Sequence, residues 1–262
     1  MKEIYEKLVS LSDEGYKKFH SALIPDIPPE RIIGVRVPLL RSMAKEISVT
    51  PEAEAFLSDL PHEYYEENNL HAFLLERIKN YDLLIAELER FLPYIDNWAT
   101  CDGLRPKALG RYPQKTAEKA LGWMKSDHTY TVRYGIGTLM NFFLGEYYAP
   151  EYPEAVAAVK SNEYYINMMR AWYFATALIG HYDDIVKILE TGRLDTFTHN
   201  KTISKSRESY RITPREKGIS ENTSKVNIKV PPFSGGIFDK SGGLFCYIHH
   251  SKAHGELYCE LI

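Results

Sequence analysis

The feature of this sequence that most restricts its fold is a helical spacing of apolar residues from Met1 to about Arg211. Apolar side chains recur at intervals of three and four positions, and short Pro, Gly or Asp-Asn breaks interrupt them. One such stripe comprises Leu83, Leu84, Ile85, Leu88, Phe91 and Leu92. We therefore expect helices over 2–20, 36–47, 51–59, 62–79, 81–92, 96–109, 114–125, 129–143, 150–160, 163–179, 181–190 and 197–211.

Helices this short cannot each bury an apolar stripe alone, so they must pack in a larger assembly. The fold that we expect for residues 1–215 is all-α: a HEAT-like repeat α-solenoid, in which antiparallel helix pairs of roughly 40–47 residues stack into a superhelix. A compact globin-like bundle is the alternative.

The chain changes character after about Arg215. Gly and Pro residues interrupt short β-prone pieces such as 226–230 and 244–248, so we expect residues 216–262 to form an irregular tail. A small β appendage, a partner-binding arm and a loosely ordered end all fit this composition. The Cys and His residues of the tail lack the spacing of the usual zinc motifs, so we expect no metal site.

Composition indicates an ordinary globular protein. The chain is 44% hydrophobic and 26% charged, and no apolar run reaches the length of roughly 20 residues that spans a bilayer. The first residues are acidic and amphipathic rather than a basic leader, and three cysteines are too few for a disulfide scaffold. We expect a cytoplasmic protein with no membrane segment.

The net charge of −3 means that any nucleic-acid binding must come from a local basic face. Basic side chains gather in the C-terminal helical stretch, over residues 199–217, and around residues 105–115. Acidic clusters such as Glu66-Glu67 should then lie on the opposite, convex side. A solvated charged face is the alternative. The residues that we predict to bind DNA are Arg105, Lys107, Arg111, Arg170, Lys201, Lys205, Arg207 and Arg211.

Residues 96–102 hold the strongest local signal for chemistry. Trp98 and Asp102 fall at i and i+4 of a predicted helix, which places an aromatic ring and a carboxylate on one face. Arg133 follows Trp98 by 35 positions and precedes Trp172 by 39, close to one repeat length, so all four can line one face of a solenoid. Alternatively, both tryptophans are core residues and Arg133 pairs with Asp102 or Asp127.

Several of these segments resemble the AlkD-like DNA alkylation repair family. The resemblance rests on residues 96–102, 126–137 and 161–172, together with 33–41 and 198–201, and covers most of 1–215 and none of the tail. It implies that Asp102 is the catalytic carboxylate, that Trp98 and Trp172 contact the deoxyribose backbone of the lesion, and that Arg133 lies near its phosphate. Ala99 departs from family members that carry an acidic residue there. An N-terminal aromatic that some members direct at the lesion has Tyr16 and Phe19 as candidates.

The resemblance implies hydrolysis of the N-glycosidic bond of cationic purines such as N3-methyladenine or N7-methylguanine, without flipping the base into a pocket. An alkylated purine is a good leaving group, so an anion and electron-rich rings that stabilise an oxocarbenium-like sugar suffice, without a cofactor. The expected partner is double-stranded DNA with alkylated bases, bound by a monomer that is nucleoid-associated in a bacterium. A non-catalytic binder of damaged or branched DNA and a protein-interaction scaffold are the alternatives.

Overall fold

The computed structural model describes residues 2–208, and within this range it contains thirteen α-helices and no β-strand. The prediction of an all-α fold is confirmed. The predicted tail 216–262 and Arg211 lie outside the described residues. The helices are α1 (Lys2–Ser10), α2 (Glu14–Ser21), α3 (Val37–Ile47), α4 (Pro51–Ser58), α5 (Tyr65–Leu75), α6 (Tyr81–Phe91), α7 (Trp98–Gly103), α8 (Pro113–Trp123), α9 (Thr129–Phe142), α10 (Glu151–Ala158), α11 (Tyr164–Ala177), α12 (Tyr182–Glu190) and α13 (Thr196–Glu208).

Two predicted helices differ from those observed. The helix expected over 2–20 is broken, because the Asp13 side chain accepts the Tyr16 N–H at 2.9 Å and starts a new helix there. The helix expected over 96–109 is only six residues long. It begins where the Asn97 side chain accepts the Thr100 N–H at 2.8 Å, and it ends where Leu104 adopts an extended conformation.

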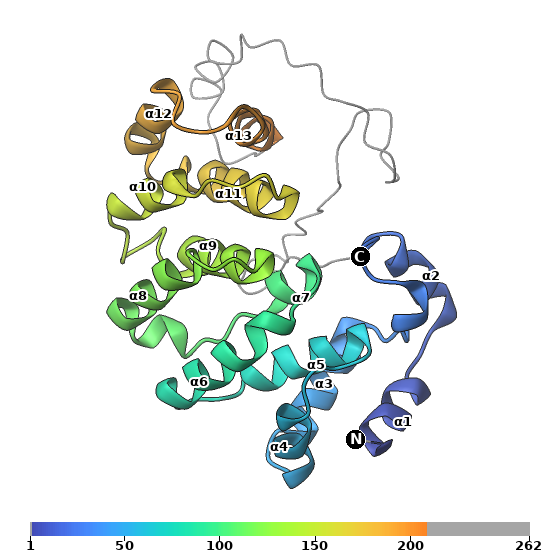
Figure 1. Cartoon of the computed structure of the whole chain (residues 1–262). Coiled ribbons are helices and arrows are strands. Elements are labelled where there is room, and N and C mark those ends of the chain that lie inside the picture. The colour runs from blue at the N-terminus through green and yellow to red at the C-terminus, as the bar shows by residue number, and fades with distance from the viewer. Residues whose placement is uncertain (1, 209–262) are drawn as a thin grey trace, which may run out of the picture. The chain divides into compact units, whose positions relative to one another are not determined.

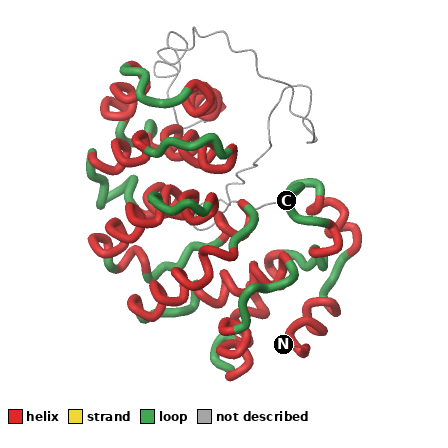
Figure 2. The backbone as a smooth tube through the Cα atoms, in the orientation of Figure 1, coloured by secondary structure: helices red, strands yellow, loops and turns green. Residues whose placement is uncertain are grey.

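The helices lie in two rows, as Figure 1 shows. Helices α5, α7, α9, α11 and α13 contact one another in turn and form one row. Helices α6, α8, α10 and α12 form the other, with α8 packed on α9 and with α10 and α12 packed on α11. Short loops carry the chain between the rows (Figure 2). Residues 2–208 are therefore stacked as in an α-solenoid.

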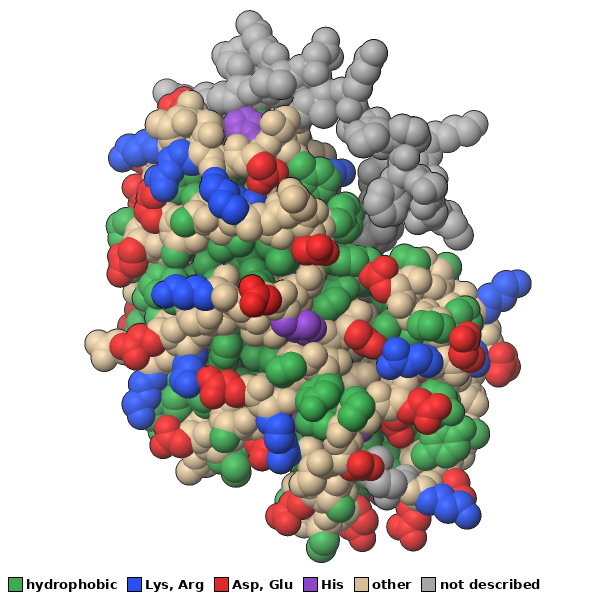
Figure 3. Space-filling model, in the orientation of Figure 1, with side chains coloured by type: hydrophobic (Ala, Val, Ile, Leu, Met, Phe, Trp, Pro, Cys, Tyr) green, Lys and Arg blue, Asp and Glu red, His purple; other side chains and the backbone are tan. Residues whose placement is uncertain are grey.

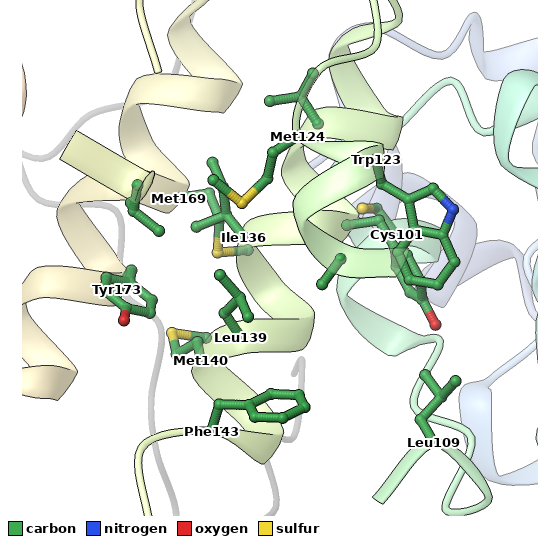
Figure 4. Packing of buried hydrophobic residues seen from close by; sticks show 14 of the residues in the cluster. Cys101, Leu109, Trp123, Met124, Ile136, Leu139, Met140, Phe143, Met169 and Tyr173 are labelled. Atoms are coloured by element: carbon green, nitrogen blue, oxygen red, sulfur yellow. The ribbon is translucent and has the colours of Figure 1, made fainter. Parts of the chain in front are cut away.

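The core of the stack is built from long apolar side chains. Figure 4 shows Ile136, Leu139 and Met140 of α9 close to Met169 and Tyr173 of α11, and all five side chains are buried. Burial of such side chains contributes about 1.5–3 kcal/mol each and holds successive helices in register. A separate apolar cluster joins α1, α3, α4 and α5. Helix α7 contacts both α5 and α9, so the N-terminal helices are continuous with the stack.

Glu66 and Glu67 do not lie on an exposed convex surface, so that prediction is wrong. Glu66 is fully buried, and its carboxylate accepts the backbone N–H groups of Ile33, Gly34 and Val35 at 2.8, 2.7 and 3.2 Å. Gly34 has φ +98°, a conformation that favours glycine and that turns these N–H groups toward the carboxylate. Burial raises the pKa of the Glu66 carboxyl. Glu66 therefore organises the loop before α3, whereas Glu67 accepts the backbone N–H groups of Glu63 and Tyr64 at the start of α5.

Two buried histidines form a hydrogen-bonded polar pair in the first half of the chain. His62 Nε2 and His71 Nδ1 are 2.8 Å apart, and the rings stack on Phe56 and Phe91 with centroids 4.3 and 3.9 Å apart. Burial lowers the pKa of His62 to about 4 and that of His71 to about 2. Both imidazoles are therefore neutral in the folded protein near neutral pH.

This pair predicts a loss of stability in mild acid. The unfolded chain binds protons at these histidines near their ordinary pKa of 6.5, whereas in the folded chain His62 binds one only near pH 4 and His71 only near pH 2. The free energy of unfolding should thus fall as the pH drops from about 6.5 toward 4, by up to about 1.4 kcal/mol per pH unit for each histidine. Urea unfolding at several pH values measures this slope. A His62→Leu, His71→Leu double variant should show a shallower slope; an equal slope would refute the assignment.

Candidate functional site

The predicted site residues lie on three successive helices of one row. Asp102 is on α7, Arg133 on α9 and Trp172 on α11, and all three line one pocket. Arg105, in the loop after α7, lines the same pocket. The spacing of 39 positions between Arg133 and Trp172 therefore does bring distant residues to one pocket, because the interval carries the chain through one helix of the opposite row and back.

Asp102 and Arg133 form a bidentate ion pair inside this pocket. Arg133 Nε donates to Asp102 Oδ1 at 2.8 Å, and Arg133 Nη2 donates to Asp102 Oδ2 at 2.6 Å. The side chains are only 10% and 6% exposed, respectively. The remaining guanidinium nitrogen donates to the carbonyl oxygen of Tyr165 at 2.7 Å. The prediction that Arg133 contacts a phosphate is corrected, because its guanidinium is buried and occupied by Asp102 and Tyr165.

Trp172 and Trp98 have different surroundings. Both are half-buried, but Trp172 lines the pocket with Asp102 whereas Trp98 does not. The indole N–H of Trp98 donates to the carbonyl oxygen of Leu23, in the loop after α2, at 3.3 Å. The structure thus brings Trp172, but not Trp98, together with the ion pair.

Tyr16 and Phe19, the two candidates for an N-terminal aromatic residue directed at the lesion, differ in exposure. Tyr16 is buried, with its ring stacked on His20 at a centroid distance of 5.2 Å and the Arg36 guanidinium over it. Phe19, on the same helix, is 46% exposed. Of the two, Phe19 is the side chain that solvent reaches.

Arg170 is wrongly predicted as a DNA-binding residue. It is fully buried in α11, and its Nη1 lies 2.5 Å from Asp195 Oδ2. The guanidinium also donates to the Asn167 side chain at 2.9 Å and to the Val156 and Ala157 carbonyl oxygens at 3.3 Å each. A side chain enclosed in this way ties α11 to α10 and to the loop before α13, and it cannot reach a phosphate.

The other predicted DNA-binding residues lie nearer the surface. Lys107, Arg111 and Arg207 are exposed, and Arg105, Lys201 and Lys205 are half-buried. On the face seen in Figure 3, however, basic and acidic side chains alternate, and no continuous basic surface is visible there. Binding of a polyanion such as DNA to this face would thus depend on individual basic side chains rather than on a continuous basic surface.

Residues that the sequence reasoning missed surround the loop after α7. Glu76, at the end of α5, accepts the backbone N–H of Arg105 at 2.8 Å and a guanidinium N–H of Arg41 at 2.6 Å. Nothing in the sequence around Glu76 marks it, since an acidic residue at a helix end is ordinarily solvated. Arg41 lies within 33–41, one of the segments that carry the family resemblance, and this was the signal that could have marked it as a site residue.

Two kinds of feature are missing from the described part of the chain. Within 2–208 no group of three or more His, Cys, Asp or Glu side chains is arranged to hold a metal ion. Among the helices of the same residues, none has the length and apolarity needed to span a membrane.

Comparison with known proteins identifies one family. The model of the family described as DNA alkylation repair enzyme matches residues 4–167, more than half of the chain. The match includes Trp98, Asp102 and Arg133, and it ends within α11 before Trp172. No curated protein matches the chain.

Proposed function

Because the chain belongs to the family of DNA alkylation repair enzymes, we propose that it is a DNA glycosylase that hydrolyses the N-glycosidic bond of cationic alkylated purines. The observation that carries this proposal is the convergence of Asp102, Arg133 and Trp172 on one pocket from three helices. Substrates of the N7-methylguanine and N3-methyladenine type fit this set, because they need little beyond stabilisation of the sugar cation.

The chemistry proposed for Asp102 is electrostatic. As the bond to a cationic purine breaks, positive charge moves onto the deoxyribose, and a nearby carboxylate stabilises this oxocarbenium-like state. A carboxylate has about four lone-pair positions, and Arg133 uses two of them, so Asp102 can still orient a water toward the sugar. Arg133 thereby holds the carboxylate in one orientation. The indole of Trp172 adds cation–π attraction to the developing charge.

The size of the pocket supports a mechanism in which the base stays outside it. The space that the pocket offers suits a water molecule rather than a purine ring. The pocket can therefore hold the attacking water beside Asp102 while the alkylated base leaves from the exposed side of the sugar.

We further propose that residues 1–215 act as the DNA-binding unit, as a cytoplasmic monomer on double-stranded DNA and without a cofactor. Trp98, one helical turn before Asp102, is proposed to contact the DNA backbone beside the lesion.

Free bases measure the proposed activity directly. Purified protein is incubated with methylated genomic DNA, and the bases released into solution are identified by mass spectrometry. Release of N7-methylguanine or N3-methyladenine above the rate of spontaneous depurination is the expected result. If the protein releases no alkylated base, the glycosylase proposal fails.

One observation favours a second function, a non-catalytic binder of damaged or branched DNA. Both carboxylate oxygens of Asp102 are engaged by a buried guanidinium, which offsets the negative charge that catalysis needs. Tight, salt-sensitive DNA binding without release of a base would identify this function.

The proposed role of Trp172 gives a specific prediction. Trp172→Ala should lower the rate of excision by about ten-fold, the equivalent of one cation–π contact, since the indole lines the pocket beside Asp102. Trp172→Phe keeps an aromatic face and should lose less. Single-turnover excision from methylated DNA gives both rates. Equal losses in the two variants would show that packing, rather than the ring face, explains the effect.

A further inference from the structure

We propose that Arg105 binds the DNA phosphate next to the damaged nucleotide, a role that the family resemblance implied for Arg133. This inference rests on the proposed function, since it names the group that holds the DNA backbone at the same pocket. It follows from the geometry of the loop after α7 and from the balance of charge around the pocket.

The loop fixes the Arg105 side chain beside Asp102. Arg105 lines the pocket, and its Nε donates to the backbone carbonyl oxygen of Asp102 at 2.8 Å. No hydrogen bond within residues 2–208 uses its two terminal nitrogens. The anchored Nε directs the guanidinium, and the terminal nitrogens are left to bind a ligand.

Glu76, at the end of α5, and Arg41, on α3, hold the same loop in place. Glu76 accepts the Arg105 backbone N–H, and Arg41 donates to Glu76 at 2.6 Å and to the Gly103 carbonyl oxygen at 3.3 Å. The Arg41 guanidinium also lies 4.0 Å from the centre of the Phe73 ring. The end of α7 is thus tied to α3 and α5, and the backbone of Arg105 cannot move away from the pocket without breaking these bonds.

Of the charged side chains that line the pocket, Arg105 is the one whose charge no ion pair among the described residues offsets. Asp102 is paired with Arg133, and Glu76 is paired with Arg41. Arg105 has no ion pair within the described residues. A guanidinium with free terminal nitrogens binds a phosphate in a bidentate manner, and the anionic group of DNA that lies beside every sugar is the phosphodiester.

The salt dependence of DNA binding tests this proposal. A duplex carrying a tetrahydrofuran abasic analogue and the matching undamaged duplex are titrated with wild-type protein and with Arg105→Ala, Arg105→Lys and Arg77→Ala. Arg77 is the matched control, because it is exposed, donates through Nε to the Ser48 hydroxyl and lies outside the pocket. Single-turnover excision from methylated DNA is measured for the same proteins.

Arg105→Ala should reduce the slope of log affinity against log salt by about 0.9, the contribution of one phosphate contact, with a larger loss of affinity for the abasic-analogue duplex. Arg105→Lys should keep the slope but recover excision only in part, because an ammonium lacks the bidentate geometry. Arg77→Ala should behave as wild type.

An unchanged slope in Arg105→Ala, or an equal change in Arg77→Ala, would overturn the assignment. If the wild type binds DNA but releases no base, the glycosylase proposal fails alone, and the slopes still decide the role of Arg105. If the wild type binds neither duplex, both proposals fall.

Discussion

Asp102→Asn should lower the release of N7-methylguanine by about a hundred- to a thousand-fold, while the affinity for duplex DNA is retained. The amide keeps the size and shape of the side chain but removes the charge that stabilises the sugar cation. DNA affinity should persist because Asp102 is a buried partner of Arg133 rather than a contact to phosphate. Single-turnover excision and a binding titration on the same preparation measure the two effects.

The ion pair complicates this variant, because an asparagine leaves the Arg133 guanidinium buried without a charged partner. Removing one member of a buried pair costs about 3–5 kcal/mol, whereas replacing both by apolar residues is often close to neutral. An Asp102→Leu, Arg133→Met double variant therefore serves as the control. It should unfold near the wild-type urea midpoint and still release no base.

These variants separate stability from catalysis. Wild-type excision by the stable double variant would remove Asp102 from the mechanism. Loss of excision in both variants, with folding restored in the second, assigns the effect to the carboxylate.

Arg170→Ala should destabilise the protein by about 3–5 kcal/mol, the largest effect on stability that we expect from a single charged residue. The change leaves a cavity in α11 and removes the partner of Asp195, whose carboxylate also accepts the Thr198 N–H at 2.9 Å. Although partial burial opposes it, donation by Thr198 and Arg170 keeps the pKa of Asp195 below its ordinary value. Urea unfolding gives the free energy of unfolding of each variant.

A matched exposed ion pair provides the control for Arg170. Arg193 pairs with Glu154 at the surface, and such pairs contribute about 0–1 kcal/mol, so Arg193→Ala should be nearly neutral. The salt slope of DNA binding should be the same in wild type and in any folded Arg170→Ala protein. A stable Arg170→Ala protein with a reduced slope would restore the DNA-binding role predicted from the sequence.

Helices and their order could be predicted from the sequence because they depend on local spacing. The apolar stripe over 81–92 and the polar caps at helix starts are formed by residues close together in the sequence. The bounds of α6 were therefore predicted to within one residue. The break at Asp13 was missed because a capping carboxylate inside a continuous helical pattern looks like an ordinary surface residue.

The partners of charged side chains could be predicted only in part: the ion pair of Arg133 with Asp102 was one of two alternatives, whereas the pair of Arg170 with Asp195 was not predicted. Arg133 and Arg170 both sit on helices of one row, yet the first is enclosed with Asp102 and the second with Asp195. These contacts join residues 31 and 25 positions apart, so they depend on how helices pack and not on local spacing. Glu66 is another example, since its three backbone donors come from a loop far upstream.

The repeat spacing predicted which residues share a row, but not which side chains meet. Trp172 and Asp102 line the same pocket, whereas Trp98, on the same helix as Asp102, turns to the Leu23 carbonyl oxygen. The orientation of a helix of only six residues depends on its caps and on the helices that it packs against. Because the packing contacts are tertiary, the spacing of residues in the sequence does not predict which way each face of α7 points.

The most direct measurement is a crystal structure of the Asp102→Asn variant bound to a duplex that contains one methylated purine. The proposal predicts that the deoxyribose of the damaged nucleotide lies against residue 102 and Trp172, with the purine outside the protein and the adjacent phosphate on Arg105. Duplex bound instead along the row of α6, α8, α10 and α12, with the pocket of Asp102 and Arg133 facing solvent, would contradict it.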